Sequence, residues 1–445
     1  MKLILPYLTT RMDTDLLLTF FLTPLWWLTG FNIFVYQFTA GLVLLKLLVG
    51  CIRSNEALKF HPLLLIFLFF LFSYFISLCV NFTHYPEQRV FASINNYFVL
   101  IMGFFLMVAV GHVRLGPFLF TFSKICYFLS LFVGLTGVFF LALWIFGNHE
   151  MEMPTLLGKL IPSLLQFPFF YMFLVIRVIS SDWLFMELPR LSIFSGVCTA
   201  TGGFLLGTLP LAAAYLKLGR KKNPLYYLAF LPALVALVFS LSRTSICGLL
   251  AAIVFVWFFE RRHKGWIAIL ALLVSFLTSG FLYDAFIWLL KVRSVSTTGR
   301  LHLYIEALRL VAQENLFFGI GVRPREGFTM MAVGSHSTYV GFLLVTGVFG
   351  LSLFILFQMA VLRSWISQSF YIKNSEQKIW WKYLGMSFVG TSLWFFTDPV
   401  DSLPFIAYGY FIVTAAILSL PRMEPAPSAL SEDLSSNQAE GASIP

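Results

Sequence analysis

The sequence predicts an all-α membrane protein with about twelve transmembrane helices, and its composition is the first reason. Hydrophobic residues make up 59% of the 445 residues and charged residues only 11%, whereas a soluble domain carries about 25% charged residues. The mean hydropathy is +0.86. Apolar runs of about 18 or more residues, long enough to cross a bilayer as a helix, fill most of the chain. These runs are apolar on every face, which excludes the alternating strands of a β-barrel.

Apolar runs bounded by charges and turn residues place the spans along the chain. Their approximate ranges are 14–30, 33–52, 62–81, 91–111, 117–147, 192–216, 225–241, 244–259, 266–286, 337–358, 383–397 and 404–421. The stretch 163–180 is interrupted by Pro168, so we expect an interfacial or re-entrant segment there. Residues 1–421 are thus one predicted transmembrane domain. The tail 422–445 is rich in Pro, Ser and acidic residues, which predicts a disordered cytoplasmic segment.

Lysine and arginine are distributed unequally between the two sides of the membrane. With the N-terminus inside, the basic residues of the cytoplasmic loops are Arg53, Lys59, Arg114, Lys217, Arg220, Lys221, Lys222, Arg261, Arg262, Lys264, Arg363, Lys373, Lys378 and Lys382. The short outer loops carry only Arg89 and Arg243. This asymmetry predicts that the two long segments 148–191 and 287–336, the second with short helices, lie outside. The net charge of +10 then reflects attraction to anionic membrane lipid, because no long basic block suggests nucleic-acid binding.

Four candidate site residues share a position near the predicted outer start of a helix: Arg190, Arg243, Arg300 and His336. A helix N-terminus already carries about half a positive charge and disfavours a cation by roughly 0.3–1 kcal/mol. A bound anion reverses this penalty, since arginine forks and free helix N–H groups both bind phosphate oxygens. The pattern therefore predicts a site for a di-anionic phosphate group at the outer membrane surface. In the alternative interpretation, each arginine reaches the interface or pairs with a carboxylate from Glu187, Glu306 or Glu326.

His336 has two interpretations as well. At a helix N-terminus its pKa should fall below the usual ~6.5, and the neutral imidazole could then act as a general base for a hydroxyl. Otherwise it is a structural histidine. No second histidine or carboxylate lies at metal-ligand spacing, and His302 is distant in sequence, so we expect neither a metal nor another cofactor.

Two glycines shape the segment LFFGIGVRPREGF. Gly319 and Gly321 predict turns with positive φ, while Arg323 and Arg325 are expected to add exposed charge. Without a preceding strand in a βαβ unit, this Gly-x-Gly pair predicts only a turn and not a nucleotide site.

The order of these motifs resembles the bacterial O-antigen ligase and polymerase family, the WaaL- and Wzy-like proteins. The matching elements over about 240–352 are Ser242-Arg243, Gly299-Arg300, Gly319-Ile320-Gly321, His336 with Tyr339, and Gly347 to Leu351. Some positions depart from the family pattern. The family's histidine is usually followed by Asn, here Ser337, and its loop helix commonly carries Trp, here Tyr304.

The resemblance implies a metal-independent, inverting glycosyltransferase of the bacterial inner membrane that acts in lipopolysaccharide or surface polysaccharide assembly. Its donor would be a glycan on a polyprenyl (undecaprenyl) diphosphate, and its acceptor a lipid- or glycan-linked sugar hydroxyl. Arg190, Arg243 and Arg300 would hold the diphosphate, and His336 would activate the hydroxyl.

Three functions remain open from the sequence. A ligase, slightly favoured, uses a lipid A core sugar as acceptor, whereas a polymerase uses another lipid-linked repeat. A secondary transporter or flippase for an anionic lipid or glycan is the alternative from another class. Transporters place polar groups at mid-bilayer and often show repeated halves. Here the only basic residues inside the spans are Lys46 and Lys124, and no repeat is found, which favours the enzyme.

Overall fold

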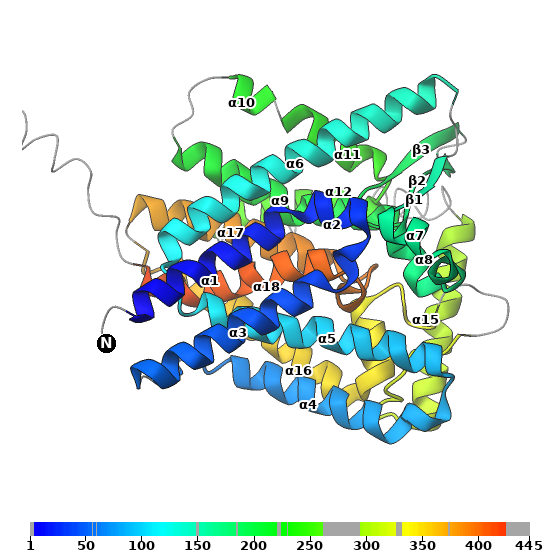
Figure 1. Cartoon of the computed structure of the whole chain (residues 1–445), viewed down its shortest axis with the longest axis horizontal. Coiled ribbons are helices and arrows are strands. Elements are labelled where there is room, and N and C mark those ends of the chain that lie inside the picture. The colour runs from blue at the N-terminus through cyan, green and yellow to red at the C-terminus, as the bar shows by residue number, and fades with distance from the viewer. Residues whose placement is uncertain are drawn as a thin grey trace, which may run out of the picture.

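The structure is a computed structural model that describes residues 4–55, 57–58, 60–147, 151–183, 186–219, 224–228, 230–260, 294–325, 332–372 and 374–423. Long antiparallel helices form a bundle, and the N-terminus lies at one end of it (Figure 1). A small sheet, short helices and α15 (Ser294–Glu314) gather at the opposite end, which we call the site end.

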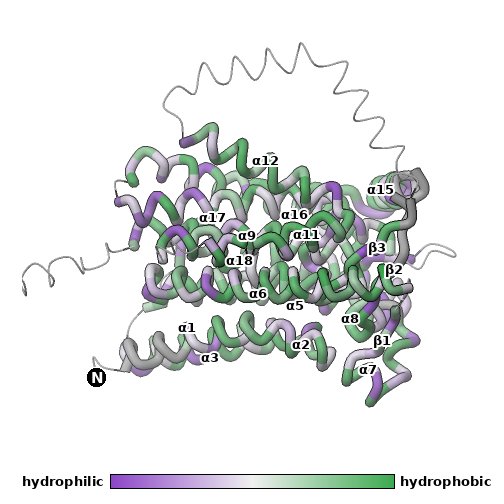
Figure 2. Tube along the Cα trace, turned by 90° about the horizontal axis from the view of Figure 1, so that it is seen from above, coloured by the Kyte–Doolittle hydropathy of each residue, from purple (hydrophilic) through white to green (hydrophobic). Residues whose placement is uncertain are grey.

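The first half of the chain contributes six helices to the bundle. They are α1 (Ile4–Phe21), α2 (Thr23–Thr29), α3 (Val35–Ser54), α4 (Leu64–Asn81), α5 (Glu87–Val110) and α6 (Leu115–Ile145). The second half contributes α9 (Cys198–Leu218), α10 (Leu225–Leu228), α11 (Phe230–Phe239), α12 (Arg243–Glu260), α16 (Thr338–Gln368), α17 (Ser375–Trp394) and α18 (Pro404–Ser419). Figure 2 shows hydrophobic residues along most of the length of these helices.

Eight helices of the described residues are long and apolar enough to cross a membrane, namely α3, α4, α5, α6, α9, α12, α16 and α18. The predicted class, a helical polytopic membrane protein, is confirmed. The predicted span 225–241 divides into α10 and α11, and the predicted span 266–286 lies outside the described residues, as does the tail 424–445. The number twelve remains a prediction.

The centre of the bundle is formed by α9 and α18, where almost every residue is buried. On α12, by contrast, Leu250 and Val254 are exposed along the helix. Apolar side chains on an outward face are the expected partners of lipid tails, since hydrocarbon imposes no penalty on them. The exposed apolar surface is thus explained by a bilayer around the bundle.

One element departs from the all-α prediction. The segment after α6 forms a three-stranded antiparallel sheet in the order β1 (Met151–Pro154), β2 (Val175–Trp183) and β3 (Met186–Ser192). Valine and isoleucine in β2 favour strands. Total hydrophobicity, which predicts membrane spans, does not distinguish these β-branched residues from other apolar ones. Short helical pieces, α7 (Leu156–Leu160), η3 (Pro162–Gln166) and α8 (Pro168–Leu174), lie between β1 and β2, so no spanning helix occupies 163–180.

Basic residues lie at the helix termini of the end away from the site. Arg53 in the last turn of α3, Arg114 at the N-cap of α6 and Lys217 in the last turn of α9 all lie away from the site end. Lys and Arg in short loops favour the cytoplasmic side of the membrane. We therefore expect the site end to face outward.

Cysteine labelling tests this orientation. Glu314→Cys at the end of α15 and Tyr371→Cys after α16 introduce exposed thiols at opposite ends, in a variant whose native cysteines are replaced. An impermeant maleimide should label Glu314→Cys in intact spheroplasts, and Tyr371→Cys only after permeabilisation. The unmodified cysteine-free parent is the control, and the reverse labelling pattern contradicts the orientation.

Candidate active site

Arg243 occupies the position that the sequence predicts, at the first turn of a capped helix. α12 begins at Arg243 itself. The Ser245 N–H donates to Ser242 Oγ at 3.4 Å, and the hydroxyls of Ser242 and Ser245 are 2.7 Å apart. Ser242 thus caps the helix and fixes where the chain leaves the turn. The Arg243 side chain is half-buried at the site end of the bundle.

Arg190 reaches the same place from a strand, and not from a helix start as expected. It lies on β3 opposite Ile179, while the following helix begins only at Cys198. Arg190 Nε donates to the carbonyl of Ser240 at 3.3 Å. Because Ser240 is in the turn before α12, this bond joins the sheet to the region around Arg243.

Arg300 is also displaced from its predicted position. α15 begins at Ser294, so Arg300 lies in its second turn and not at its start. Thr298 and Gly299 therefore do not cap the helix. Arg300 Nη1 donates to the carbonyl of Thr397 at 3.5 Å, and the hydroxyl oxygens of Thr397 and Thr244 are 2.8 Å apart. The loop before α18 thereby links Arg300 to the start of α12.

The three guanidinium groups lie close enough together that the positive charges of Arg300 and Arg190 both act on Arg243. Within the described residues, neither Arg190 nor Arg300 forms an ion pair with a carboxylate. Glu306 pairs instead with Arg309 at 3.7 Å. Like charges that converge in a partly buried place favour a bound anion.

His336 lies in the turn before α16, next to this cluster. The N-cap of α16 is Ser337, whose Oγ accepts from the Val340 N–H at 3.3 Å. The hydroxyl of Tyr304 on α15 donates to the His336 carbonyl at 2.7 Å. Burial, together with the charges of Arg300 and Arg190, lowers the pKa of His336 to about 4. The imidazole is therefore neutral at pH 7, chiefly through burial and not through the helix terminus that the sequence suggested.

Asp398 is a member of the site that the sequence analysis missed. It lies between α17 and α18, is only 1% exposed, and accepts hydrogen bonds from Thr199 and, at 2.9 Å, from Thr397. Burial raises its pKa to about 6, while the charges of Arg300 and Arg190 oppose the rise. A signal was present: TDPVDS places two acidic residues between apolar runs in a chain with few acids.

His336 and Asp398 both line a cavity of about 170 Å³. Three arginines, Arg89, Arg323 and Arg325, line the same cavity. Arg323 was expected to be exposed, but it is 2% exposed and pairs at 2.8 Å with the fully buried Asp401. A buried charge needs such a partner, and the loop between α15 and α16 folds inward to provide it.

The predicted Gly-x-Gly turn is present and holds this loop in place. Gly319 and Gly321 both have φ of +69°. The Ile320 and Gly321 N–H groups donate to the carbonyls of Leu344 and Val345 on α16, at 2.9 and 3.0 Å. A Cβ at Gly321 would lie 2.4 Å from the backbone oxygen of Ser77, so only glycine allows this close approach.

Tyr339 is not part of the cavity wall. Its hydroxyl donates to Gln358 Oε1 at 2.9 Å, inside the bundle. It therefore anchors the first turn of α16 and through it the preceding His336 turn. The sequence motifs thus divide into two groups, one that meets at the arginine cluster and one that positions the backbone.

Comparison with known proteins identifies the segment that carries most of these residues. Residues 228–355, from α10 to the middle of α16, match a family model described as O-antigen ligase. Over this segment the chain is similar to the O-antigen ligase family. The matched range includes Arg243, Arg300 and His336, whereas Arg190 and Asp398 lie outside it. Searches of curated proteins and of solved structures find no match.

The buried Arg323–Asp401 pair should dominate the stability of the site end. Arg323→Met leaves the buried Asp401 carboxylate unpaired, a change that typically costs about 3–5 kcal/mol. We expect a lower melting temperature in detergent and less protein in the membrane. The double variant Arg323→Met/Asp401→Asn should recover part of both, because no uncompensated charge remains. A single variant as stable as wild type would contradict this role.

Proposed function

We propose that this protein transfers a glycan from a polyprenyl diphosphate to the hydroxyl of an acceptor sugar at the outer face of the bacterial inner membrane. The family match supports a role in surface polysaccharide assembly. The proposed transfer reaction is supported by the convergence of Arg190, Arg243 and Arg300 beside a neutral, buried histidine.

The arginines supply what the leaving group requires. When the bond between the anomeric carbon and the diphosphate oxygen breaks, its electron pair stays on that oxygen, and negative charge develops there. Guanidinium groups placed in advance stabilise this charge without reorganisation, and their paired N–H donors match phosphate oxygens. Since three such groups converge, we propose that the transfer needs no metal ion.

His336 supplies the other half of the reaction. The acceptor hydroxyl gives its proton to the imidazole while its oxygen forms the new bond to the anomeric carbon. Attack opposite the leaving diphosphate inverts that carbon. A base must be unprotonated to act, and the low pKa of His336 keeps it so at neutral pH.

Asp398 is proposed to position the cluster. Its carboxylate is subject to the charges of Arg300 and Arg190 and is held by two threonine hydroxyls, from Thr199 and Thr397. The negative charge of the ionised Asp398 carboxylate offsets part of the repulsion between the arginines before the donor binds.

The description of the matched family favours ligation onto a lipid-anchored acceptor over polymerisation, which would use the same donor site. It also favours group transfer over the transporter or flippase alternative. The donor, the acceptor and the outward orientation are parts of this proposal.

Replacement of Arg243 or Arg300 tests the donor site. Either arginine changed to Ala should abolish transfer at a normal protein level, because each contributes charge to the leaving group. Lysine should restore only part of the rate, since an ammonium cannot form the bidentate fork. Arg309→Ala, an exposed arginine on the same helix as Arg300, is the matched control and should retain activity. Full activity of both Ala variants would exclude the proposed diphosphate site.

The pH dependence tests His336. His336→Ala should lose roughly 10²–10⁴-fold in rate, the usual range for acid–base catalysis, while donor binding persists. In wild type, protonation of His336 should lower kcat/KM for the donor as the pH drops through about 4. A bound diphosphate favours the imidazolium and raises its pKa, so the acid limb of kcat should lie at higher pH.

Donor binding measured alongside both profiles separates a base from a structural histidine. If the Ala variant keeps near-normal turnover, or loses donor binding together with turnover, His336 is not the base. A variant that retains binding but lacks the acid limb supports the assignment.

A further inference from the structure

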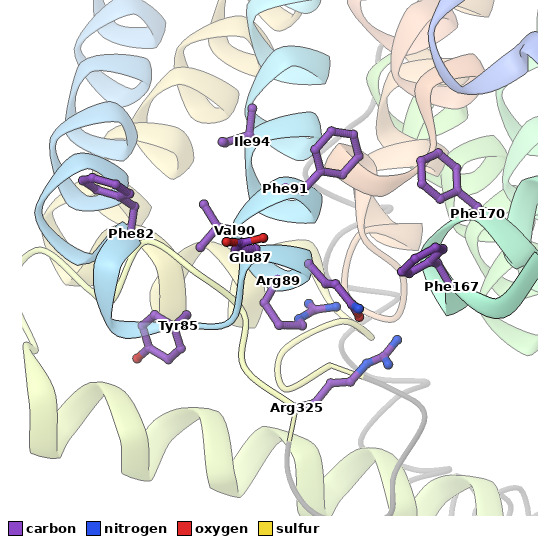
Figure 3. A pocket seen from close by; sticks show the side chains of 11 residues that line it. Phe82, Tyr85, Glu87, Arg89, Val90, Phe91, Ile94, Phe167, Phe170 and Arg325 are labelled. Atoms are coloured by element: carbon purple, nitrogen blue, oxygen red, sulfur yellow. The ribbon is translucent and has the colours of Figure 1, made fainter. Parts of the chain in front are cut away.

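A second pair of arginines lines the same cavity as His336. Arg89 is in the first turn of α5, and Arg325 follows the Gly-x-Gly turn. Both line the His336 cavity, and both also line a larger groove of about 510 Å³. The groove and the cavity therefore meet at these two side chains. Figure 3 shows both guanidinium groups extending into the groove.

The walls of the groove are aromatic. Phe82 and Tyr85, which precede α5, line the groove on one side (Figure 3). The other side is lined by Phe91 of α5, Phe170 of α8 and Phe167, the residue before α8. Aromatic rings present flat apolar faces, on which the C–H face of a sugar ring can pack. The groove thus combines apolar walls with a charged floor.

The positive charge of this floor is not balanced by the described residues. The charge of Arg323 is compensated by Asp401, but Arg89 and Arg325 form no ion pair within the described ranges. Arg89 Nε donates to the Arg323 carbonyl at 2.7 Å, which leaves its two terminal nitrogens for other partners. Arg325 Nε is buried and has no hydrogen-bond partner among the residues that the structure describes.

Among the described residues, the carboxylate of Asp398 lines the cavity with Arg89 and Arg325 but forms an ion pair with neither. Glu87 lines the groove but is exposed and beyond ion-pair distance from either arginine. Glu326 lies outside the described residues. Arg89 is moreover subject to the like charges of Arg325 and Arg323. Two neighbouring guanidinium groups in a half-buried place match a dianion, since phosphate carries about −1.5 to −2 at pH 7.

We infer that Arg89 and Arg325 bind a phosphate group of the acceptor, with the sugar ring that carries it packed on the aromatic walls. This inference rests on the proposed function and adds the acceptor's side of the site. Arg190, Arg243 and Arg300 line neither the cavity nor the groove. Donor and acceptor would thus approach His336 from different sides, each guided by its own arginines.

The apolar tail of a polyprenyl donor is the competing occupant of the groove. A hydrocarbon tail would fill the aromatic walls but leave two guanidinium groups without partners, and burial of unpaired charge is unfavourable. A phosphate on the acceptor satisfies both the floor and the walls. The charge of the groove therefore favours the acceptor.

Arg325→Gln is the decisive variant, because Arg89 also supports the loop through the Arg323 carbonyl. The probe is acceptor glycolipid extracted from cells that lack this protein, used intact or after removal of its phosphate groups with hydrogen fluoride. With intact acceptor, Arg325→Gln should raise the acceptor KM by about 10- to 100-fold, as expected for a lost charged hydrogen bond. The donor KM and kcat should stay within about threefold of wild type. Arg309→Gln removes one exposed charge at the same end and should change none of these values.

The dephosphorylated acceptor separates the possible outcomes. Wild type should bind it with the raised KM of the variant, and Arg325→Gln should then cause no further change. A variant that raises the donor KM and leaves the acceptor KM unchanged would assign the groove to the donor tail. An equal effect of Arg325→Gln on both forms of the acceptor would also overturn the phosphate assignment. Absence of transfer by the wild type would instead contradict the proposed function itself.

Discussion

The buried ion pair between Arg323 and Asp401 is the contact on which the site end depends. It joins the loop that follows α15 to the loop that precedes α18, so that two distant parts of the chain share one fixed position. Next to it, Thr338 Oγ1 donates to the Asp398 carbonyl at 2.8 Å and accepts from the Val400 N–H at 2.9 Å. These bonds set the start of α16, and with it the His336 turn, against Asp398.

A bundle in hydrocarbon has few places for such polar contacts. Charged groups near the bilayer centre are expensive, whereas the ends of helices border water and lipid headgroups. The arginines therefore collect at one end, where loops and a small sheet can position them. A neutral histidine thus lies near Arg190 and Arg300 and lines a cavity with Arg89, Arg323 and Arg325.

Burial, more than the helix dipole, sets the chemistry of His336 and Asp398. Both groups have their uncharged forms favoured by desolvation, which lowers one pKa and raises the other. The charges of Arg300 and Arg190 add to the first shift and oppose the second. One electrostatic environment thus keeps the histidine unprotonated while the aspartate stays near its titration range.

The sequence by itself determined the class of the protein and most of its helices, because membrane spans depend on local composition and length. It also determined the capped start of α12 at Arg243 and the positive φ of Gly319 and Gly321, which follow from local backbone rules. Only the tertiary structure placed Arg190 on a strand, brought Asp398 to the cluster and buried Arg323 against Asp401. Those positions depend on contacts between residues far apart in the chain, and neither periodicity nor composition records which distant charges will meet.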